Sequence, residues 1–351
     1  MTHTFLASAG QITWRLLEMH GLDARAVFRR HGLGAADIRD PNARLPSAKL
    51  DLVAGEAAAR IADPAFALRA ARCWHPSNLG VLGHAWLSSS TLRRGLERMV
   101  RYGRLVGEKM STRLQDTPEG VKLTIDNGRT DPVVGPIVTD LSMSVLVDMC
   151  RMNFGASFRP RQVQLKRSAP HARHEYSAFY GCPVHFNAPE DSFTLSARDA
   201  DEPLPTSNRQ LAATLDRLIT EQLAHLDRNN VATRCQASLL EQLSSGELSE
   251  EQMAQRLHMS RRTLQRKLAE AETTYQKLLD DTRRDLALRY LEDPRHSITD
   301  ITFLLGFSQQ SAFTRAFRRW TGMSPTDYRA AHPPRPARLR PLDRGHGDLR
   351  S

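Results

Sequence analysis

The chain has 351 residues, 49 lysines and arginines against 39 acidic residues, a formal net charge of +10, and 40% hydrophobic residues. Such a chain can build more than one hydrophobic core, which excludes a disordered polymer and predicts two or three domains. The basic balance favours polyanionic partners such as nucleic acid, although many basic proteins bind none. No apolar run approaches the ~20 residues of a membrane span, and no signal peptide is apparent, so we expect a soluble intracellular protein without membrane partners.

The four cysteines, Cys73, Cys150, Cys182 and Cys235, form no CxxC pair and no cysteine–histidine cluster with zinc spacing. We therefore expect reduced thiols in a cytosolic protein, with neither a metal nor a cofactor.

The first half of the chain predicts a mixed α/β domain that starts helical. Apolar residues recur at three- and four-residue spacing, which predicts helices at residues 12–20, 24–31, 47–61, 64–73 and 91–106. Residues 111–115 and 121–126 alternate and predict a hairpin. Further on we expect short strands at 162–166, 184–187 and 192–195, and helices at 137–153 and 171–180.

Beyond a Pro-rich break at residues 201–208, the pattern is helical as far as residue 330. We expect an N-terminal effector-binding and dimerisation domain at 1–205, a linker helix at 206–230, an all-α domain at 231–330 and a disordered basic tail at 331–351. Residues 231–330 hold 15 lysines and arginines against 13 acidic residues, a net +2. An argument for DNA binding must therefore rest on where the charges lie.

Residues 297–321 predict two helices joined by a sharp turn. Ser297 can cap the first helix, Gly306 can adopt the positive φ that ends it, and Ser308 can cap the second. The second helix places aromatic side chains on one face and a polar, arginine-bearing surface on the opposite face. This pattern is typical of a helix-turn-helix whose second helix enters a major groove. The aromatic face consists of Phe313, Phe317 and Trp320.

The same plan recurs at residues 248–270. His258 occupies the turn, Ser260 can cap the second helix, and Leu264 and Leu268 point inward. When Leu264 is aligned with Phe313, the later copy has one residue more between cap and core anchor. Amphipathic helical hairpins are common, but two copies within one hundred residues, each with arginine on its exposed face, favour DNA binding.

A long helix is expected at residues 275–292, between the two copies. It would be about 25 Å long, so the two outer helices would lie about 34 Å apart, one turn of DNA. Its expected buried stripe comprises Tyr275, Leu278, Leu279, Leu286 and Tyr290.

Three segments of the second half, SRRTLQRKL, YQKLLDDTRRDLALRYLEDP and ITDITFLLGFSQQSAFTRAFRRWTGMSPTDYR, closely resemble the DNA-binding domain of the AraC/XylS family of bacterial transcription regulators. The resemblance covers about residues 231–330. It implies an all-α domain with two helix-turn-helix units, at about 248–270 and 297–321, joined by a long helix and bound to asymmetric promoter sites.

The first two hundred residues resemble the arabinose-binding-like N-terminal domain of that family, through DPAFALRAARCWHPSNLGVLGHAWLSSSTLRRGLERMVRYGRLV and HEYSAFYGCPVHFNAPEDSFTLSARDADEPLPTSN. That domain serves regulators with varied effectors, so the resemblance does not imply arabinose.

The resemblance assigns roles to residues of both copies. Base-facing positions are Arg262, Gln265, Arg266, Gln310, Ser311, Thr314 and Arg315. Beside these faces lie the residues that we expect to anchor phosphate, namely Ser260, Arg261, Lys267, Ser308, Arg318 and Arg319. The alternative for both sets is a solvated, solubilising helix surface.

The effector pocket of the first domain has weaker candidates. They are His75, His84, Trp86, Tyr102 and His185. Satisfied histidines and aromatic residues of an ordinary core are the alternative for all five.

Two residues depart from the family pattern. His258 stands where the turn usually has glycine, and a left-handed conformation there costs roughly 1–2 kcal/mol. Thr302 stands where alanine is usual, and its hydroxyl can bond back to the carbonyl of Ile298.

The resemblance implies a regulator rather than an enzyme, without cofactor, bound to promoter DNA in the cytoplasm and on the nucleoid. Our main hypothesis is an effector-responsive activator that touches RNA polymerase and forms a homodimer. An alternative is an effector-independent regulator whose first domain only dimerises. An enzyme fused to a DNA reader, such as a thiol alkyl acceptor, would need a zinc-clustered cysteine that the spacing does not offer.

Overall fold

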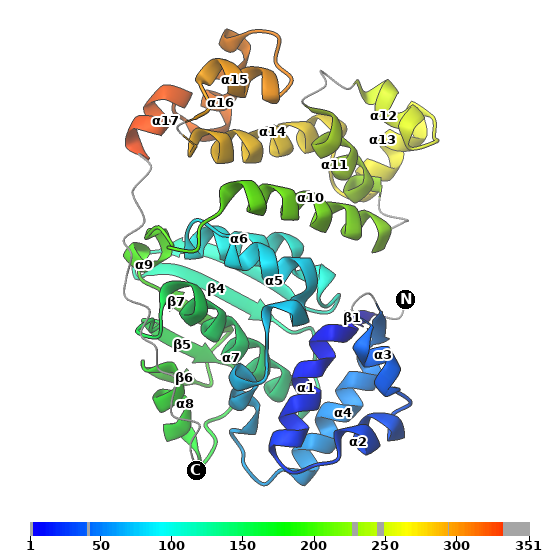
Figure 1. Ribbon diagram of the computed structural model, residues 1–351, viewed down its shortest axis with the longest axis vertical. Coiled ribbons are helices and arrows are strands. Elements are labelled where there is room, and N and C mark those ends of the chain that lie inside the picture. The colour runs from blue at the N-terminus through cyan, green and yellow to red at the C-terminus, as the bar shows by residue number, and fades with distance from the viewer. Residues whose placement is uncertain (1–2, 41–42, 227–230, 244–248, 294, 333–351) are drawn as a thin grey trace. The chain divides into compact units, whose positions relative to one another are not determined.

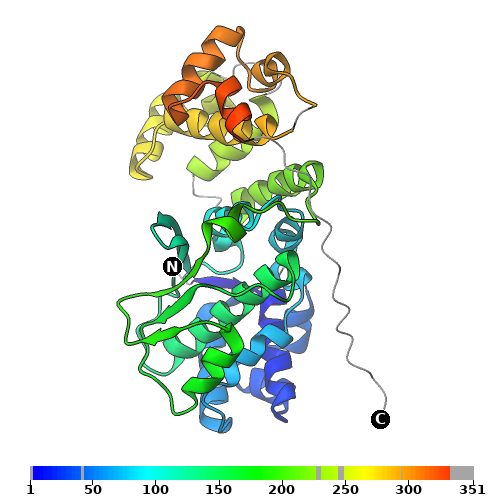
Figure 2. The ribbon, with the colours of Figure 1, turned by 90° about the vertical axis from the view of Figure 1, so that its left-hand side faces the viewer.

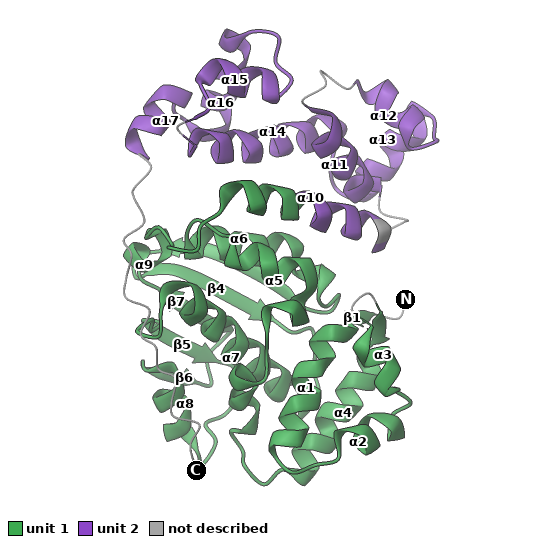
Figure 3. Ribbon diagram, viewed as in Figure 1, with its two compact units in different colours: residues 1–216, 337–351 green, residues 217–336 purple. Residues whose placement is uncertain are grey.

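The computed structural model describes residues 3–40, 43–226, 231–243, 249–293 and 295–332 (Figure 1). The chain divides into two compact units, and the boundary falls between Asp216 and Arg217 (Figure 3). That boundary lies inside helix α10 (Arg209–Leu226), the helical part of the predicted linker. Of the tail expected at 331–351, only Ala331 and His332 lie within the described residues.

The first unit begins with helices, as predicted, and with two short strands. The sequence patterns did not predict these strands. Strand β1 (Thr4–Leu6) pairs antiparallel with β2 (Arg44–Pro46). Helix α1 starts at Ala7, earlier than the predicted residue 12, because its first turn is built of small buried residues that carry no large-apolar periodicity. The other helices of this layer are α2 (Ala24–Arg30), α3 (Ala35–Arg39) and α4 (Ser47–Arg60). In Figures 1 and 2 this blue layer, with α1 (Ala7–Met19), lies to one side of the sheet.

The sheet has five strands in the order β3-β4-β7-β5-β6. The predicted hairpin is confirmed: β3 (Ser111–Thr117) pairs with β4 (Gly120–Asp126) in an antiparallel register. Strand β7 (Asp191–Leu195) is buried along its whole length at the centre of the sheet, and β5 (Gln162–Leu165) pairs with it. Strand β6 (Val184–Phe186) is parallel to β5.

The remaining helices of the first unit depart from the predictions at several places. The helix predicted at 64–73 is a 3₁₀ helix, and the one predicted at 91–106 ends as a 3₁₀ turn beyond Tyr102. Helix α5 (Gly80–Leu87) was not predicted, because its glycines resemble breakers. Gly83 instead allows close packing, since an added Cβ would lie 2.0 Å from the carbonyl oxygen of Pro76. The other elements are η1 (Phe66–Arg72), η2 (Pro76–Leu79), α6 (Leu92–Tyr102), η3 (Gly103–Leu105), α7 (Val134–Phe154), α8 (Arg173–Tyr180) and α9 (Ala197–Asp201).

The described part of the second unit is helical. Beyond α10 it contains α11 (Val231–Gln242), α12 (Glu250–Arg256), α13 (Arg261–Glu270), α14 (Tyr275–Leu291), α15 (Ile298–Leu304), α16 (Gln310–Thr321) and α17 (Pro325–Ala331). Two predicted boundaries lie outside the described residues. They are Leu248, where the helix now given as α12 was expected to start, and Pro294, part of the expected stop of α14.

Helix α14 lies between α11–α13 and α15–α16 (Figure 1). Its residues belong to two separate hydrophobic cores. Tyr275 and Leu279, near its start, pack with residues of α11, α12 and α13. Ala287 and Leu291, near its end, pack with residues of α15 and α16. Leu286 contacts both cores. Three residues of the buried stripe predicted for this helix are only half-buried, namely Leu278, Leu286 and Tyr290. The reason is that the first half of α14 packs against one core and the second half against the other.

Candidate nucleic-acid interface

The first helix pair, α12 and α13, is joined by the turn at His258. Ser249 caps α12, with its hydroxyl accepting from the Gln252 N–H at 3.2 Å. His258 adopts a φ of 58°, so the left-handed conformation considered from the sequence is present. Ser260 caps α13 as predicted, accepting from the Thr263 N–H at 3.2 Å. Serine side chains therefore define where both helices of this pair begin.

The second helix pair, α15 and α16, repeats the plan with one difference. Ser297 caps α15 and accepts from the Asp300 N–H at 3.0 Å, and Gly306 has a φ of 71°. The prediction that Ser308 caps α16 is wrong. The capping position is Gln309, which makes no side-chain cap bond, because the additional residue of this copy lengthens the turn and delays the helix by one position.

Each pair buries one face of its second helix. Leu264 and Leu268 of α13 are buried in the first core, and Phe313 and Phe317 of α16 in the second. The inward residues predicted for both helices are thus confirmed. Trp320 is half-buried beside the second core.

The predicted base-facing residues lie on the opposite faces. Six of them are exposed, and Thr314 is half-buried. The exposed ones are Arg262, Gln265, Arg266, Gln310, Ser311 and Arg315. The interpretation of these faces as contact surfaces requires accessibility, and the structure provides it.

Several of these side chains have partners within the protein. Arg266 Nη1 lies 2.6 Å from Glu270 Oε1, one helical turn away. Glu250 Oε2 accepts from Arg261 Nε at 2.8 Å and from Gln265 Nε2 at 3.0 Å. The glutamate at the start of α12 therefore holds two side chains of α13 in place. The sequence reading did not identify Glu250, since the contact depends on how the two helices cross.

The predicted phosphate anchors also lie at the surface. Lys267 is half-buried and the others are exposed, namely Ser260, Arg261, Ser308, Arg318 and Arg319. Arg319 Nη2 reaches Asp280 of α14 at 2.9 Å. Exposed ion pairs of this kind contribute roughly 0–1 kcal/mol, so breaking them costs little free energy.

Arg283 of α14, which sequence reasoning missed, holds the turn of the second pair from inside. It is 4% exposed, and its Nε donates to the Leu305 carbonyl at 2.9 Å and its Nη2 to the Gly306 carbonyl at 3.1 Å. Its guanidinium also lies 4.3 Å from the ring centroid of Phe307. An arginine inside an otherwise apolar helical stripe was the available signal.

Thr302 is fully buried in α15. Its hydroxyl donates to the carbonyl of Ile298 at 2.8 Å, as expected from the sequence. The departure from alanine is therefore accommodated by a local hydrogen bond.

The five effector-pocket candidates do not form one site. His75, His84 and His185 are exposed on three different elements, while Trp86 and Tyr102 are buried. Trp86 donates its indole N–H to the Met149 carbonyl at 3.0 Å and is a satisfied core residue. None of the five lines a cavity of the first unit that lies between α1, α4 and α7. Aromatic and histidine content in the sequence does not show which side chains face a cavity, and the assignment of these five residues to an effector pocket stays a prediction.

All four cysteines are free, and only Cys182 is not buried. Burial raises the pKa of the Cys182 thiol to about 11 and that of Cys235 to about 12, which keeps both protonated at neutral pH. No group of three or more metal-ligating side chains occurs within the described ranges. Among the helices that the structure describes, none has the length and hydropathy of a membrane span.

Comparison with known families gives two matches. Residues 21–204 match the arabinose-binding domain of AraC transcription regulator, N-terminal. Residues 253–331 match a helix-turn-helix domain family, a range that begins within α12 and includes the whole of the second helix pair.

Curated relatives match over most of their length. The ornithine utilization regulator of Pseudomonas aeruginosa is 28% identical over 327 residues, 90% of this chain and 93% of the relative. The HTH-type transcriptional regulator VirS of Mycobacterium tuberculosis is 28% identical over 320 residues, with the same two coverages, 90% and 93%. The crystal structure of transcriptional regulator CdpR from Pseudomonas aeruginosa is 22% identical, covers 91% of this chain and 98% of that chain, and has a TM-score of 0.48.

Proposed function

Because the chain belongs to the AraC family of DNA-binding transcription regulators, we propose that both helix pairs read promoter DNA and that the first unit binds an effector. The observation that carries the proposal is the repeated geometry of the two pairs: a left-handed turn, a buried face, and an exposed polar face. In a helix-turn-helix this arrangement places the second helix in a major groove.

In this proposal α13 and α16 are the recognition helices, and α14 spaces them. Arg262 and Arg266 would read guanine, and Gln265 would read adenine, since each pairing can be bidentate. On α16 the corresponding readers are Gln310, Ser311, Thr314 and Arg315. Phosphate contacts come from Ser260, Arg261, Lys267, Ser308, Arg318 and Arg319.

Glu250 and Glu270 act as intramolecular competitors for this surface. Arg266 leaves Glu270, and Gln265 leaves Glu250, when base edges replace them. A nonspecific duplex offers phosphate but no matching base edge, so the acidic partners penalise it more than the operator. The two glutamates would thus contribute to discrimination.

The first unit would make the regulator responsive. An effector shifts a conformational equilibrium only by its differential affinity for the two states, so it must favour one arrangement of sensor and DNA-binding unit. The name of one relative, an ornithine utilization regulator, is consistent with a small-molecule input. Activation through RNA polymerase and dimerisation through the first unit belong to the same proposal. The alternative is a regulator without effector, whose first unit only dimerises.

The test begins with genome-wide mapping of bound DNA, which supplies an operator. Arg266→Ala should then weaken operator binding by about 1–3 kcal/mol and relax the preference at one base pair. Arg284→Ala on α14, where the arginine pairs with Asp281 at 3.1 Å, is the matched control. Equal losses on operator and random duplexes would show that Arg266 only contacts phosphate.

Salt dependence tests the phosphate contacts separately. Operator affinity should fall steeply with salt, because neutralised phosphates release counterions. Arg318→Ala should lower the slope of log affinity against log salt by about 1. A flat salt response of the unsubstituted protein would contradict docking into the groove.

A further inference from the structure

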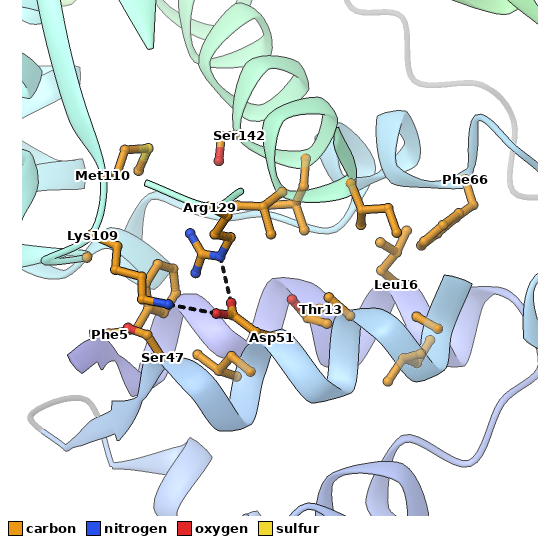
Figure 4. Close-up of a pocket in the computed structure, with 18 residues that line it drawn as sticks. Phe5, Thr13, Leu16, Ser47, Asp51, Phe66, Lys109, Met110, Arg129 and Ser142 are labelled. Atoms are coloured by element: carbon orange, nitrogen blue, oxygen red, sulfur yellow. Dashed lines mark hydrogen bonds and ion pairs between the residues drawn. The ribbon is translucent and has the colours of Figure 1, made fainter. Parts of the chain in front are cut away.

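The first unit contains an apolar cavity between α1, α4 and α7 (Figure 4). Its walls are mostly aliphatic or aromatic, including Leu16, Leu50, Ala54, Phe66, Ile137 and Leu141. The cavity measures about 70 Å³. Since one water needs roughly 10–15 Å³ on such a measure, the space holds roughly five to seven atoms of that size.

Charge is present at one place in this wall. Among the described residues that line the cavity, the charged ones are Asp51, Lys109 and Arg129. Lys109 Nζ lies 3.0 Å from one oxygen of Asp51, and Arg129 Nε lies 2.6 Å from the other (Figure 4). Two cations therefore face one carboxylate, and the cavity carries a net positive charge.

The positively charged side chains of this group have limited access to solvent. The side chain of Arg129 is 9% exposed, and its Nη1 also donates to the Asn127 carbonyl at 2.8 Å. A cation with little access to water is stabilised by an additional anion. A ligand carboxylate would bring the charge of the group to zero, whereas a ligand ammonium would raise it further.

The segment that carries Lys109 is anchored by strand β1. The Leu6 N–H donates to the Val106 carbonyl at 2.7 Å, and the Glu108 N–H donates to the Thr4 carbonyl at 3.1 Å. Phe5 packs on Gly107, where an added Cβ would lie 2.7 Å from its ring, and both residues line the cavity. The backbone that carries Lys109 is therefore fixed by hydrogen bonds to β1.

We propose that this cavity takes a small monocarboxylate with an apolar body, of about four or five carbons by the size above, whose carboxylate shares Lys109 and Arg129 with Asp51. The proposal deepens the proposed function, since it identifies the effector class of the sensor and rests on that role. The aliphatic wall binds the body of the ligand, and the two cations bind its head group.

Titration calorimetry on the full chain tests the ligand class. The probes are butanoate and pentanoate, with butanamide and butylamine as neutral and cationic controls of similar shape. The carboxylates should bind, and the amide and amine should bind at least about tenfold more weakly. Equal binding of butanoate and butanamide would overturn the assignment of the charged group, as would preferential binding of butylamine.

Variants of the charged group predict effects of opposite sign. Lys109→Met should weaken pentanoate binding by about ten- to a hundredfold, whereas Asp51→Asn should strengthen it, because the carboxylate no longer competes for the two cations. Lys122→Met, which removes the same charge from the ion pair with Glu190 on the sheet, is the matched control and should leave binding unchanged. Weaker binding in a folded Asp51→Asn protein would contradict the proposal.

A steric variant covers the case in which Asp51→Asn does not fold. Ser142→Leu adds apolar volume inside the cavity without changing charge and should abolish pentanoate binding. Folding of each variant is followed by thermal unfolding, and operator binding is measured without ligand. If the unsubstituted protein binds an operator but neither butanoate nor pentanoate, the cavity assignment is overturned. If the unsubstituted protein binds no operator, the proposed function is overturned instead.

Discussion

His258 and Gly306 occupy equivalent positions in two successive helix pairs. Both residues adopt left-handed backbone conformations, with φ of 58° and 71°. After each, the next N–H returns to a carbonyl of the preceding helix at 3.0 Å, from Met259 to Ala254 and from Phe307 to Thr302. The same turn geometry thus occurs with glycine at Gly306 and with a side chain at His258, where the β-carbon disfavours the left-handed conformation.

This strain predicts that His258→Gly stabilises the second unit. Relief of the left-handed conformation contributes roughly 1–2 kcal/mol, and the greater freedom of glycine in the unfolded chain takes back roughly 0.5–1 kcal/mol. The free energy of unfolding in urea should rise by about 0.5–1 kcal/mol. Gly306→Ala should lower it, and a destabilised His258→Gly protein would show that the imidazole makes an offsetting contact.

Arg283→Met should destabilise the second unit by about 2–4 kcal/mol, because the carbonyls of Leu305 and Gly306 lose a buried charged donor. Loss of the contact with Phe307 adds to this. Chemical denaturation measures the effect. Arg284→Met on the same helix removes only partly exposed ion pairs and should cost less than about 1 kcal/mol. Similar losses in both variants would refute a special role for Arg283.

Glu250→Gln should raise affinity for random duplexes by up to about 1 kcal/mol and lower the ratio of operator to random binding. The substitution removes a negative charge beside the proposed contact surface and weakens its hold on Arg261 and Gln265. Fluorescence anisotropy with both duplexes measures the ratio. Glu251→Gln, on the same helix end, is the control, and an identical change there would point to net charge alone.

Glu56 predicts an acid-range loss of stability in the first unit. The Arg30 guanidinium, with further bonds from Arg60 and His31, lowers the pKa of its carboxyl from 4.5 to about 2. The folded state holds this proton less tightly than the unfolded chain, so the stabilisation is present above about pH 4.5 and is lost as the pH falls toward 2.

In Glu56→Gln this part of the pH dependence should be absent, whereas the exposed Glu119→Gln should retain it. Unfolding free energies measured at steps between neutral pH and pH 2 compare the variants. A Glu56→Gln protein with the same acid slope as the parent would assign the effect to other carboxyl groups.

The local features of the second unit followed from the sequence. Ser260 and Ser297 were identified as caps, and the inward faces of α13 and α16 as core, because capping and periodicity are set within a few residues. The wrong prediction that Ser308 caps α16 also has a local cause. One additional residue in the turn shifts the start of the helix, and residue type alone does not reveal the shift. In the first unit, α5 was missed because Gly83 serves close packing rather than termination.

The amino-acid sequence by itself determined most of the helices, caps and turns of the second unit, the cap of α16 excepted, and which family the chain resembles, since these depend on short-range pattern. The tertiary structure alone decided which distant side chains meet. Lys109 and Arg129 lie 58 and 78 residues from Asp51, yet all three meet in one cavity, and Arg283 reaches a turn 22 residues away. Such contacts depend on how packed elements cross, and no local periodicity encodes that crossing.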